Sequence, residues 1–430
     1  MKLVVQPNKA AWPAILERPV LNATHLLPIV QNVMEQVQQN GDTALKQYTL
    51  QFDKVALDSI QVPSELIEAS ENKITATLKS AMETAKNNIE KFHQQQVQKV
   101  EKIETMPGVW CWRKAVGIEK VGIYIPGGTA PLFSTVLMLG VPAMLAGCKE
   151  VVLCTPPNIK GEIEPAILYA AKLVGIKKVF SVGGVQAIAA MAFGTQSVPK
   201  VHKIFGPGNQ YVTAAKQWVQ QYGTAIDMPA GPSEVCVWAD ATCNPAFVAA
   251  DLLSQAEHGV DSQVLLVSNK ETVVEEVQKA IAAQLEQLPR KETAQKALEN
   301  SKAIVLEATQ EALDLINEYA PEHLILAIEH AEVVSEKILN AGSVFIGHYS
   351  PESVGDYASG TNHTLPTNGH AKAYSGVSLD SFVKKITFQQ LTERGLHNIA
   401  QTVVEMAEAE SLAAHANAVK VRVASIQNNK

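Results

Sequence analysis

The sequence predicts an α/β protein with two tandem parallel-sheet domains and helical extensions at both ends. Short segments rich in β-branched and apolar residues, such as VGIYIP and QVLLVSN, alternate with helix-like stretches, as expected for parallel strands joined by helices. The alternation occurs in two successive series, and 430 residues are too many for one small domain. Each series is therefore predicted to form a Rossmann-like sheet of its own.

Each element follows from a local pattern. Residues 30–96 have a helical pattern with a long stretch free of proline and glycine. The first series of strands begins at Val121 with VGIYIP and continues through EVVLCTP, KVFSVGG and KIFGPGN. The second series runs from SEVCVWAD to SVFIGH. Residues 349–376 form a loop too long for an ordinary connection, which predicts a function for it. From Gln389 onward the pattern is helical again.

Composition limits the classes of function. Hydrophobic residues make up 47% and charged residues 18% of the chain, which is typical of a packed globular enzyme. The net charge of −7 argues against a nucleic-acid partner. The longest apolar stretch, residues 136–148, is too short to span a bilayer, and the N-terminus lacks the apolar core of a signal peptide. We expect a cytoplasmic protein without membrane contact, whose cysteines are reduced thiols.

Three glycine-bearing turns follow predicted strands: PGG at 126–128, GG at 183–184 and GPGN at 206–209. Such turns let backbone N–H groups approach a phosphate at the start of the next helix. A dinucleotide site is one interpretation, and ordinary turns between strand and helix are the other. GPGNQY does not complete the G-x-G-x-x-G pattern, because Tyr211 stands where the third glycine belongs. The turns alone leave both interpretations open.

Four scattered polar residues form a candidate metal set. Gln255 and His258 are three positions apart at the end of a predicted helix, which places both on one helical face. Asp356 in GDYASG and His415 in LAAHANA are polar residues in small or apolar surroundings. Together the four would supply two nitrogens and two oxygens, a set that suits zinc. The other interpretation is a helix end at which His258 caps carbonyl groups before Gly259, and local spacing does not decide.

The sequence APEHL at 320–324 holds a candidate acid–base pair. Pro321 can start a helical turn, and consecutive side chains neither face each other on a helix nor share a face of a strand. Glu322 and His323 would then address different atoms of a ligand instead of pairing with one another, which is useful in a reaction with two proton-dependent stages. A solvated helix start is the other interpretation of this segment.

Six motifs taken together resemble the histidinol dehydrogenase family. They are VGIYIPGGTAPLFSTVLMLGVPAMLAGC, FGPGN, DMPAGPSEV, SQAEHG, APEHL and AEAESLAAHANAV, and they occur in the family's order and spacing over nearly the whole chain. The resemblance implies an enzyme that uses NAD and one Zn²⁺ per subunit. Its implied reaction is the oxidation of L-histidinol through L-histidinaldehyde to L-histidine, the last two steps of histidine biosynthesis.

The resemblance also implies roles for individual residues. The implied zinc ligands are Gln255, His258, Asp356 and His415. The implied substrate contacts are these four residues together with Ser233, Glu322, His363 and Glu410. The implied NAD contacts are Tyr124, Gln186 and Asn209. His323 would be the general base in both oxidations and Glu322 would activate water to hydrate the aldehyde, while zinc would hold the imidazole and amino nitrogens of the substrate.

A division into domains follows from these assignments. Residues 1–20 form an N-terminal arm, and residues 21–118 with 233–375 form the domain that carries the metal and catalytic residues. Residues 119–232 form the domain that binds NAD. Residues 376–430 form a helical tail. In the family this tail is exchanged in a homodimer, which implies that Glu410 and His415 act in the neighbouring subunit. From the alternation alone, however, the N-terminal helices could instead complete the domain of the first series.

Two other functions are compatible with the local patterns. One is a zinc hydrolase, in which Glu322 activates a metal-bound water and the glycine turns are structural. The other is a non-catalytic binding protein with two α/β lobes and a structural metal. Production of reduced nicotinamide would exclude the hydrolase. Chelation would separate the enzyme from the binding protein, because a structural metal is coupled to folding.

Overall fold

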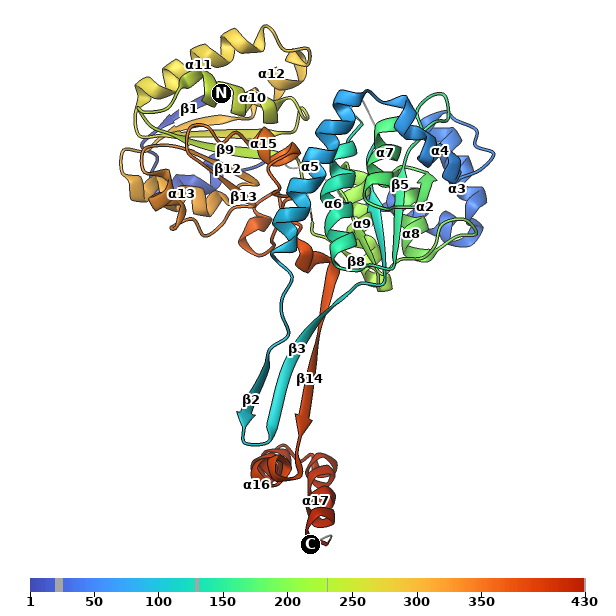
Figure 1. Cartoon of the computed structure of the whole chain (residues 1–430). Coiled ribbons are helices and arrows are strands. Elements are labelled where there is room, and N and C mark those ends of the chain that lie inside the picture. Colours follow the sequence, from blue (N-terminus) through green and yellow to red (C-terminus); the bar gives the residue numbers. More distant parts are fainter. Residues whose placement is uncertain (20–25, 128–130, 230, 429–430) are drawn as a thin grey trace. The chain divides into compact units, whose positions relative to one another are not determined.

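The computed structural model describes residues 1–19, 26–127, 131–229 and 231–428. The chain divides into two compact units. The first unit consists of Met1–Gln95 and Ile118–Phe382, and the second of Gln96–Gly117 and Val383–Lys430. Within the first unit lie two parallel sheets with helices on their faces, which we call the five-stranded lobe and the six-stranded lobe (Figure 1). The predicted α/β class with two Rossmann-like sheets is confirmed.

The five-stranded lobe has the strand order β6-β5-β4-β7-β8, with every pair parallel. Its strands are β4 (Lys120–Tyr124), β5 (Glu150–Thr155), β6 (Lys178–Ser181), β7 (Lys203–Phe205) and β8 (Ala225–Ile226). The connecting helices are α6 (Phe133–Leu145), α7 (Pro165–Leu173), α8 (Gly184–Phe193) and α9 (Gln210–Val219). The strands are apolar along their length because helices cover both faces. The order reverses between β4 and β7, where such sheets bind ligands beyond the carboxyl ends of their strands.

Four N-terminal helices pack on this same lobe. They are α2 (Leu26–Asn40), α3 (Asp42–Tyr48), α4 (Ser64–Ala69) and α5 (Ala76–Gln94). Val30 and Met34 of α2 share a hydrophobic cluster with Ile188 of α8, and Ile89 of α5 shares another with Val136 of α6. This differs from the predicted grouping of residues 21–118 with the catalytic domain. The apolar faces of these helices are buried against α6, α8 and α9 instead.

The six-stranded lobe has the order β1-β11-β10-β9-β12-β13, again with every pair parallel. Its strands are β1 (Lys2–Val5), β9 (Glu234–Ala239), β10 (Gln263–Ser268), β11 (Lys302–Val305), β12 (His323–Ala327) and β13 (Ser343–Ile346). Its helices are α1 (Trp12–Ile15), α10 (Pro245–Ala256), α11 (Glu271–Leu285), α12 (Lys291–Glu299), α13 (Thr309–Tyr319), α14 (Ala331–Ser335) and α15 (Glu352–Tyr357). The predicted N-terminal arm is therefore part of this lobe, because it supplies the edge strand β1.

The second unit is a three-stranded antiparallel sheet followed by two helices. Its elements are β2 (Lys102–Met106), β3 (Val109–Gly117), β14 (Val383–Leu391), α16 (Glu393–Ala409) and α17 (Ala413–Asn428). Two predictions need correction here. Residues 102–117 pair with β14 instead of joining the catalytic domain, and the tail begins with a strand where helix was predicted at Gln389. Strand pairing is favoured over a helix here because Trp112 of β3 stacks on Phe388 of β14, with ring centroids 5.4 Å apart.

Two expectations about the whole chain can be compared with the structure. No helix among the described residues is long and apolar enough to cross a membrane. All five cysteines are free thiols, and Cys154 and Cys236 are buried. The expected cytoplasmic location stays a prediction.

Candidate active site

The glycine turns of the five-stranded lobe meet at the carboxyl ends of its strands. Tyr124 ends β4 and is buried, and its hydroxyl oxygen accepts a hydrogen bond from the backbone N–H of Gly184 (3.1 Å). Gly206, directly after β7, has a φ of +123°, and a Cβ there would lie 2.0 Å from the backbone oxygen of Tyr124. Only glycine fits this close approach. Gly128 of the PGG turn lies outside the described residues.

A buried ion pair holds the GPGN turn in place. Nζ of Lys216 lies 2.5 Å from Asp227, and both side chains are at most 5% exposed. Lys216 also donates to the carbonyl oxygen of Gly206 (2.8 Å), and Asp227 accepts from the N–H of Gly206 (2.9 Å). Sequence reasoning missed this pair. The available signal was a charged residue in each of two otherwise apolar segments, the helix QYVTAAKQWV and the strand end AID.

The other two implied NAD contacts lie at the starts of helices. Asn209 is exposed and caps α9, with its side-chain oxygen accepting from the N–H groups of Tyr211 and Val212 (3.1 Å each). Gln186 is buried in the first turn of α8, beside Gly184. The structure thus brings Tyr124 and Gln186 to the same edge of the sheet through Gly184, and it presents Asn209 after the neighbouring strand.

One cavity of about 540 Å³ is lined by residues from both lobes of the first unit. Five of the predicted site residues line it: Asn209, Ser233, His258, Glu322 and His363. The GPGN turn reaches it from the carboxyl end of β7, whereas Ser233 and Glu322 stand just before β9 and β12. The cavity therefore lies at the carboxyl ends of one sheet and the amino ends of the other. Only the first of these positions follows the usual rule for ligand sites in open α/β sheets.

The segment APEHL ends a helix instead of starting one. Ala320 adopts a left-handed conformation with φ of +52° at the end of α13, and β12 begins at His323. The predicted helical turn at Pro321 is therefore wrong, because the left-handed residue redirects the chain into the sheet. Glu322 stands at the strand entrance, so that its side chain turns toward the same side as His323. Oε2 of Glu322 and Nδ1 of His323 are 3.7 Å apart, so the two side chains pair with each other, contrary to the prediction.

Glu322 and His323 are buried and electrostatically coupled. Burial raises the pKa of Glu322 to about 8, against the opposing effect of His323. Burial alone would lower the pKa of His323, but Glu322 and the hydrogen bond to Asp356 raise it to about 10. Both ring nitrogens of His323 face acceptors, since Nδ1 lies 3.1 Å from the carbonyl oxygen of Glu234 and Nε2 lies 3.3 Å from Oδ1 of Asp356. This environment can hold a proton on the imidazole.

Asp356, which contacts His323, is also hydrogen-bonded to His363. Nδ1 of His363 donates to the carbonyl oxygen of Asp356 (2.7 Å), and its Nε2 lies 3.0 Å from the hydroxyl of Thr135. Burial would raise the pKa of Asp356, but the hydrogen bond from His323 keeps it below its usual value. Burial also lowers the pKa of His363. Residues 349–376 are not one long loop as predicted, because they contain α15, which supplies the Asp356 carboxylate, while the segment after it supplies the imidazole of His363. Thr135 of α6 was not predicted.

Gln255 lies in the last turn of α10, but the helix ends at Ala256, so the prediction that His258 shares its helical face is wrong: His258 stands just beyond the helix, with its N–H bonded to the carbonyl oxygen of Gln255 (3.3 Å). The Gln255 amide is buried and fits in two orientations. In one, Nε2 donates to Oε2 of Glu322 (3.4 Å); in the other, Nε2 donates to Glu352 (3.2 Å) and Oε1 accepts from the N–H of Glu234 (3.1 Å). His258 lines the cavity. Burial lowers the pKa of its imidazole, against the opposing effect of Asp356.

Several carboxyl groups gather behind the cavity that sequence reasoning did not identify. Glu352 is buried, accepts from the hydroxyl of Ser254 (2.7 Å), and has a pKa raised to about 7 by burial. Glu234 is buried beside Glu322 and is paired with Arg18. Glu234 begins β9 and Glu352 lies in the first turn of α15. Neither position gave a local signal in the sequence, because both side chains reach the site only through tertiary packing.

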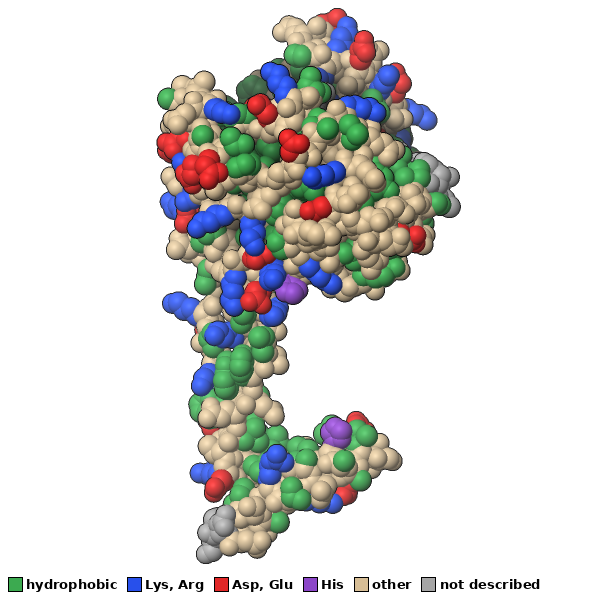
Figure 2. Space-filling model, turned by 90° about the vertical axis from the view of Figure 1, so that its right-hand side faces the viewer, with side chains coloured by type: hydrophobic (Ala, Val, Ile, Leu, Met, Phe, Trp, Pro, Cys, Tyr) green, Lys and Arg blue, Asp and Glu red, His purple; other side chains and the backbone are tan. Residues whose placement is uncertain are grey.

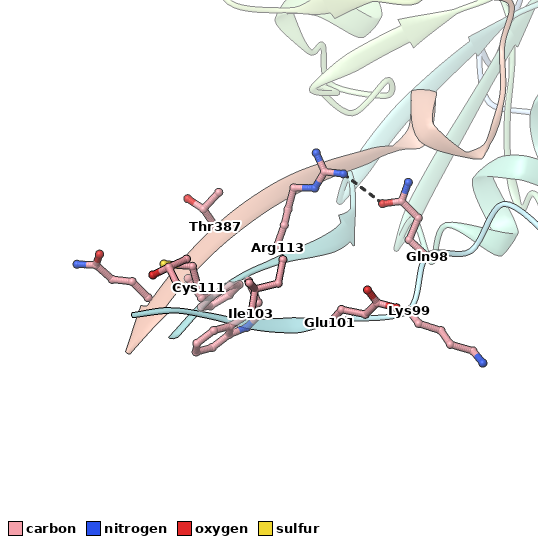
Figure 3. Close-up of a pocket in the computed structure, with 11 residues that line it drawn as sticks. Gln98, Lys99, Glu101, Ile103, Cys111, Arg113 and Thr387 are labelled. Atoms are coloured by element: carbon pink, nitrogen blue, oxygen red, sulfur yellow. Dashed lines mark hydrogen bonds between the residues drawn. The ribbon is translucent and has the colours of Figure 1, made fainter. Parts of the chain in front are cut away.

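Glu410 and His415 belong to the second unit. Glu410 caps the end of α16, and His415 lies in the first turn of α17, with its backbone N–H bonded to Leu412 (3.0 Å). The second unit has a cavity of its own, of about 610 Å³, on its three-stranded sheet (Figure 3). Arg113 and Gln98 hydrogen-bond at its edge (3.5 Å). Neither Glu410 nor His415 is among its lining residues.

Comparison with known proteins identifies the family. A family model described as histidinol dehydrogenase matches residues 16–423. This chain belongs to the histidinol dehydrogenase family. Histidinol dehydrogenase from Bacteroides thetaiotaomicron is 60% identical over 427 residues, which cover 99% of this chain and 100% of the relative. The Vibrio parahaemolyticus histidinol dehydrogenase is 53% identical over 97% of this chain and 96% of its own length.

A solved structure agrees with this assignment. Histidinol dehydrogenase from Elizabethkingia anophelis matches with a TM-score of 0.98 and 56% identity, over 99% of both chains. The sequence-based family resemblance is thus confirmed, and the chain is an oxidoreductase of histidine biosynthesis. Membership decides against the hydrolase and the non-catalytic binding protein.

Proposed function

We propose that this chain carries out the NAD-dependent, zinc-containing oxidation of L-histidinol through L-histidinaldehyde to L-histidine. One observation carries the proposal beyond family membership: Asn209 and Glu322 line the same cavity. The first stands at a glycine turn suited to a dinucleotide, and the second belongs to a buried acid–base pair. A cofactor and a substrate could therefore meet between the two lobes.

Tyr124, Gln186 and Asn209 are the proposed contacts for NAD, which when bound would accept a hydride in each oxidation. The rigid turn at Gly206 is well suited to a dinucleotide, because Lys216 and Asp227 fix its backbone on both sides. A turn fixed in advance loses little entropy when a ligand binds. The buried Tyr124 hydroxyl, with a pKa raised to about 12 by burial, stays neutral and can act only as a hydrogen-bonding group.

His323 is the proposed general base and Glu322 the proposed group that activates water. In the first oxidation, the alcohol oxygen would lose its proton to the imidazole of His323 in its neutral form, while the alcohol carbon gives up a hydride that bound NAD⁺ would accept. Glu322, in its carboxylate form, would then take a proton from the water that adds to the aldehyde. In the second oxidation, once His323 has released its first proton to solvent, the hydrate would lose a hydride to a second NAD⁺ and its hydroxyl proton would pass to His323. The contact between Glu322 and His323 lets both stages share one site.

The residues present fit a zinc ion. Gln255 supplies an amide oxygen, His258 an imidazole whose pKa is lowered so that it is neutral, and Asp356 a carboxylate whose pKa is lowered so that it is charged. Among the described residues, no three His, Cys, Asp and Glu side chains are grouped to hold a metal, which is expected if an amide and His415 complete the set. When bound, zinc would hold the imidazole and amino nitrogens of the substrate, so its contribution is orientation.

The second unit supports a homodimer in which Glu410 and His415 serve the neighbouring subunit. All five residues of β2 are exposed, and hydrophobic side chains lie on the surface of this unit, including those of Ile103, Phe388 and Met406 (Figure 2). A three-stranded sheet needs a buried apolar face to be stable. A second copy of the chain would cover these side chains.

A spectrophotometric assay with L-histidinol and NAD⁺ tests the proposal. We expect two NADH per histidinol consumed and histidine as the product by amino-acid analysis. Treatment with a chelator should abolish turnover while the circular dichroism spectrum is largely retained, and added Zn²⁺ should restore activity. Formation of a single NADH with accumulation of free aldehyde, or full activity of metal-free protein, would contradict the proposed four-electron reaction or the role of zinc.

A further inference from the structure

We propose that Arg18 is a positioning residue for Glu322 and His323, acting from the N-terminal segment through Glu234. The proposal rests on the proposed function, since it assigns Glu322 and His323 to the chemistry. Arg18 does not line the cavity, although the next residue, Pro19, does. Its effect must therefore pass through the residues that it contacts.

The Arg18 side chain makes a dense set of contacts. Nε and Nη2 donate to the two carboxylate oxygens of Glu234, at 2.5 and 2.9 Å. Nη2 also donates to the carbonyl oxygen of Tyr319 (2.7 Å), and the guanidinium lies 4.0 Å from the centre of the Tyr319 ring. The Arg18 side chain is 16% exposed and that of Glu234 only 3%. A two-pronged pair stacked on an aromatic ring requires the planar guanidinium and is not reproduced by an ammonium group.

Glu234 connects this pair to both candidate catalytic side chains. Its backbone N–H donates to Oε2 of Glu322 (2.8 Å), and its carbonyl oxygen lies 3.1 Å from Nδ1 of His323. Glu234 also begins β9, the neighbour of β12 in the sheet. If the Glu234 backbone shifts, the hydrogen bonds that orient Glu322 and His323 shift with it.

Two further contacts show that the pair organises the whole side of the cavity formed by the six-stranded lobe. Tyr319, whose carbonyl oxygen Arg18 binds, is three residues before Glu322, with the left-handed Ala320 between them. Oε1 of Glu234 also accepts from the backbone N–H of Asn368 (2.8 Å), and Asn368 lines the cavity. Arg18 therefore ties three separate segments together at the entrance of β9 and β12.

A purely stabilising ion pair would not need this arrangement. Loss of Arg18 leaves a buried carboxylate without its cation, in a region that already holds Glu322 and Glu352. The carboxylate would then draw on other donors or admit water, which moves the Glu234 backbone by a fraction of an ångström or more. Displacements of about 1 Å at a reacting group can lower a rate by about 100-fold. We expect the loss in turnover more than in substrate affinity, since Arg18 itself contacts none of the proposed zinc ligands.

The experiment compares Arg18→Ala, Arg18→Lys and the control Lys9→Met. Lys9 is a cation on the same N-terminal segment. Its ion pair is with Asp314 (2.6 Å) and is exposed, unlike the buried pair of Arg18 with Glu234. For Arg18→Ala we expect kcat with histidinol to fall about 100-fold, with KM within about threefold and zinc content unchanged. Arg18→Lys should fall by less, and low-millimolar guanidinium should partly restore Arg18→Ala. Lys9→Met should behave as the wild type.

Hydrogen–deuterium exchange supplies a readout that does not depend on turnover. Peptides covering residues 231–236 and 319–324 should exchange faster in Arg18→Ala, while peptides of the five-stranded lobe should not change. A folded Arg18→Ala or Arg18→Lys variant with wild-type kcat, or with unchanged exchange in both peptides, would overturn the proposal. If Arg18→Ala does not fold, Arg18→Lys decides by the same criteria. Failure of the wild type to reduce NAD⁺ would instead contradict the proposed function, and the exchange data would still test Arg18.

Discussion

Oε2 of Glu322 lies 3.7 Å from Nδ1 of His323, so two consecutive residues share one buried site. This is possible because Glu322 precedes β12, where the alternation of side chains between sheet faces does not yet apply. The backbone of Glu234 holds both side chains from the adjacent strand. In the proposed mechanism, Glu322 activates water and His323 acts as the general base. Because the two roles belong to different side chains, each can be tested by its own substitution.

Glu322→Gln should slow the conversion of aldehyde to acid far more than that of alcohol to aldehyde. A positioned carboxylate contributes about 100-fold or more to proton transfer, and glutamine keeps the shape without the basicity. Single-turnover assays started from histidinol and from histidinaldehyde measure the two stages separately. Glu329→Gln, at an exposed position after the same strand, is the control. Equal slowing of both stages would remove the proposed water-activating role.

His415→Asn should lose most of its zinc and most of its activity. An asparagine cannot replace an imidazole nitrogen in a zinc site without a large loss of affinity. Metal content by atomic emission and turnover with added Zn²⁺ provide the measurements. His397→Asn is a matched control, since it is an exposed histidine in the same unit. Normal zinc content and turnover in His415→Asn would contradict the ligand assignment.

Mixing two inactive variants tests whether sites are shared between chains. Glu322→Gln lies in the first unit and His415→Asn in the second. If the second unit of one chain serves the other chain, a mixed dimer has one site with both residues intact, and about a quarter of wild-type activity should return after statistical exchange. Subunit exchange is verified by mass spectrometry of tagged chains. Proven exchange without recovered activity would count against the shared site.

Gly206→Ala should weaken NAD⁺ binding at least tenfold by calorimetry. A Cβ at this position would lie 2.0 Å from the backbone oxygen of Tyr124, so either the turn or the strand end must move. Such strain at one backbone position costs about 1–3 kcal/mol. Gly223→Ala is the control, because its φ is also positive (+82°) but no atom lies within 4 Å of the added carbon. Equal NAD⁺ affinities for the two variants would show that the close approach at Gly206 has no bearing on the cofactor.

The stability contribution of Asp53 should depend on pH. Burial raises the pKa of Asp53 to about 6, and among the described residues its Oδ2 has no hydrogen-bond partner. Because the folded state holds the proton more tightly than the unfolded chain, stability falls as pH rises from about 4 to about 6 and stays lower above it.

Asp53→Asn removes this dependence, so its Tm relative to the wild type should be higher at pH 8 than at pH 4. The side chain is partly exposed, and solvent screening reduces the effect to about 1 kcal/mol, or about 2 °C. Asp58→Asn, at an exposed position on the same segment, is the control. A difference of the opposite sign would contradict the raised pKa.

The sequence predicted the parts of this protein that repeat a local pattern. Alternating strands and helices predicted both sheets, and the spacing of Gln255 and His258 predicted a helix end on the site. The left-handed Ala320 had no such pattern, because alanine is a helix former and nothing in its local sequence favours a left-handed helix end. The pairing of residues 109–117 with 383–391 was missed for a related reason, since the burial of β2, β3 and β14 shows no clear period of two.

Contacts between distant positions were beyond sequence reasoning. Arg18 and Glu234 are 216 positions apart, and each is an ordinary charged residue next to a proline or a serine. Motifs transferred from the family identified residues that touch ligands, and they gave no indication of the residues that hold them. The Lys216–Asp227 pair behind the GPGN turn is a second example.

The edge strand β1 has a consequence for how the protein is made. Residues 2–5 pair with residues 302–305, so the first strand to leave the ribosome finds its neighbour only after about 300 further residues have been synthesised. The strands of the five-stranded lobe, all within residues 120–226, are synthesised much earlier, although Val377 and Phe382 complete its core only later. A nascent chain can thus pair the strands of one sheet while its N-terminal segment, with Arg18, still lacks its partners in the other. The nascent chain should therefore depend most on chaperones, and be most sensitive to a bulky N-terminal tag, after β1 and before β11 has been synthesised.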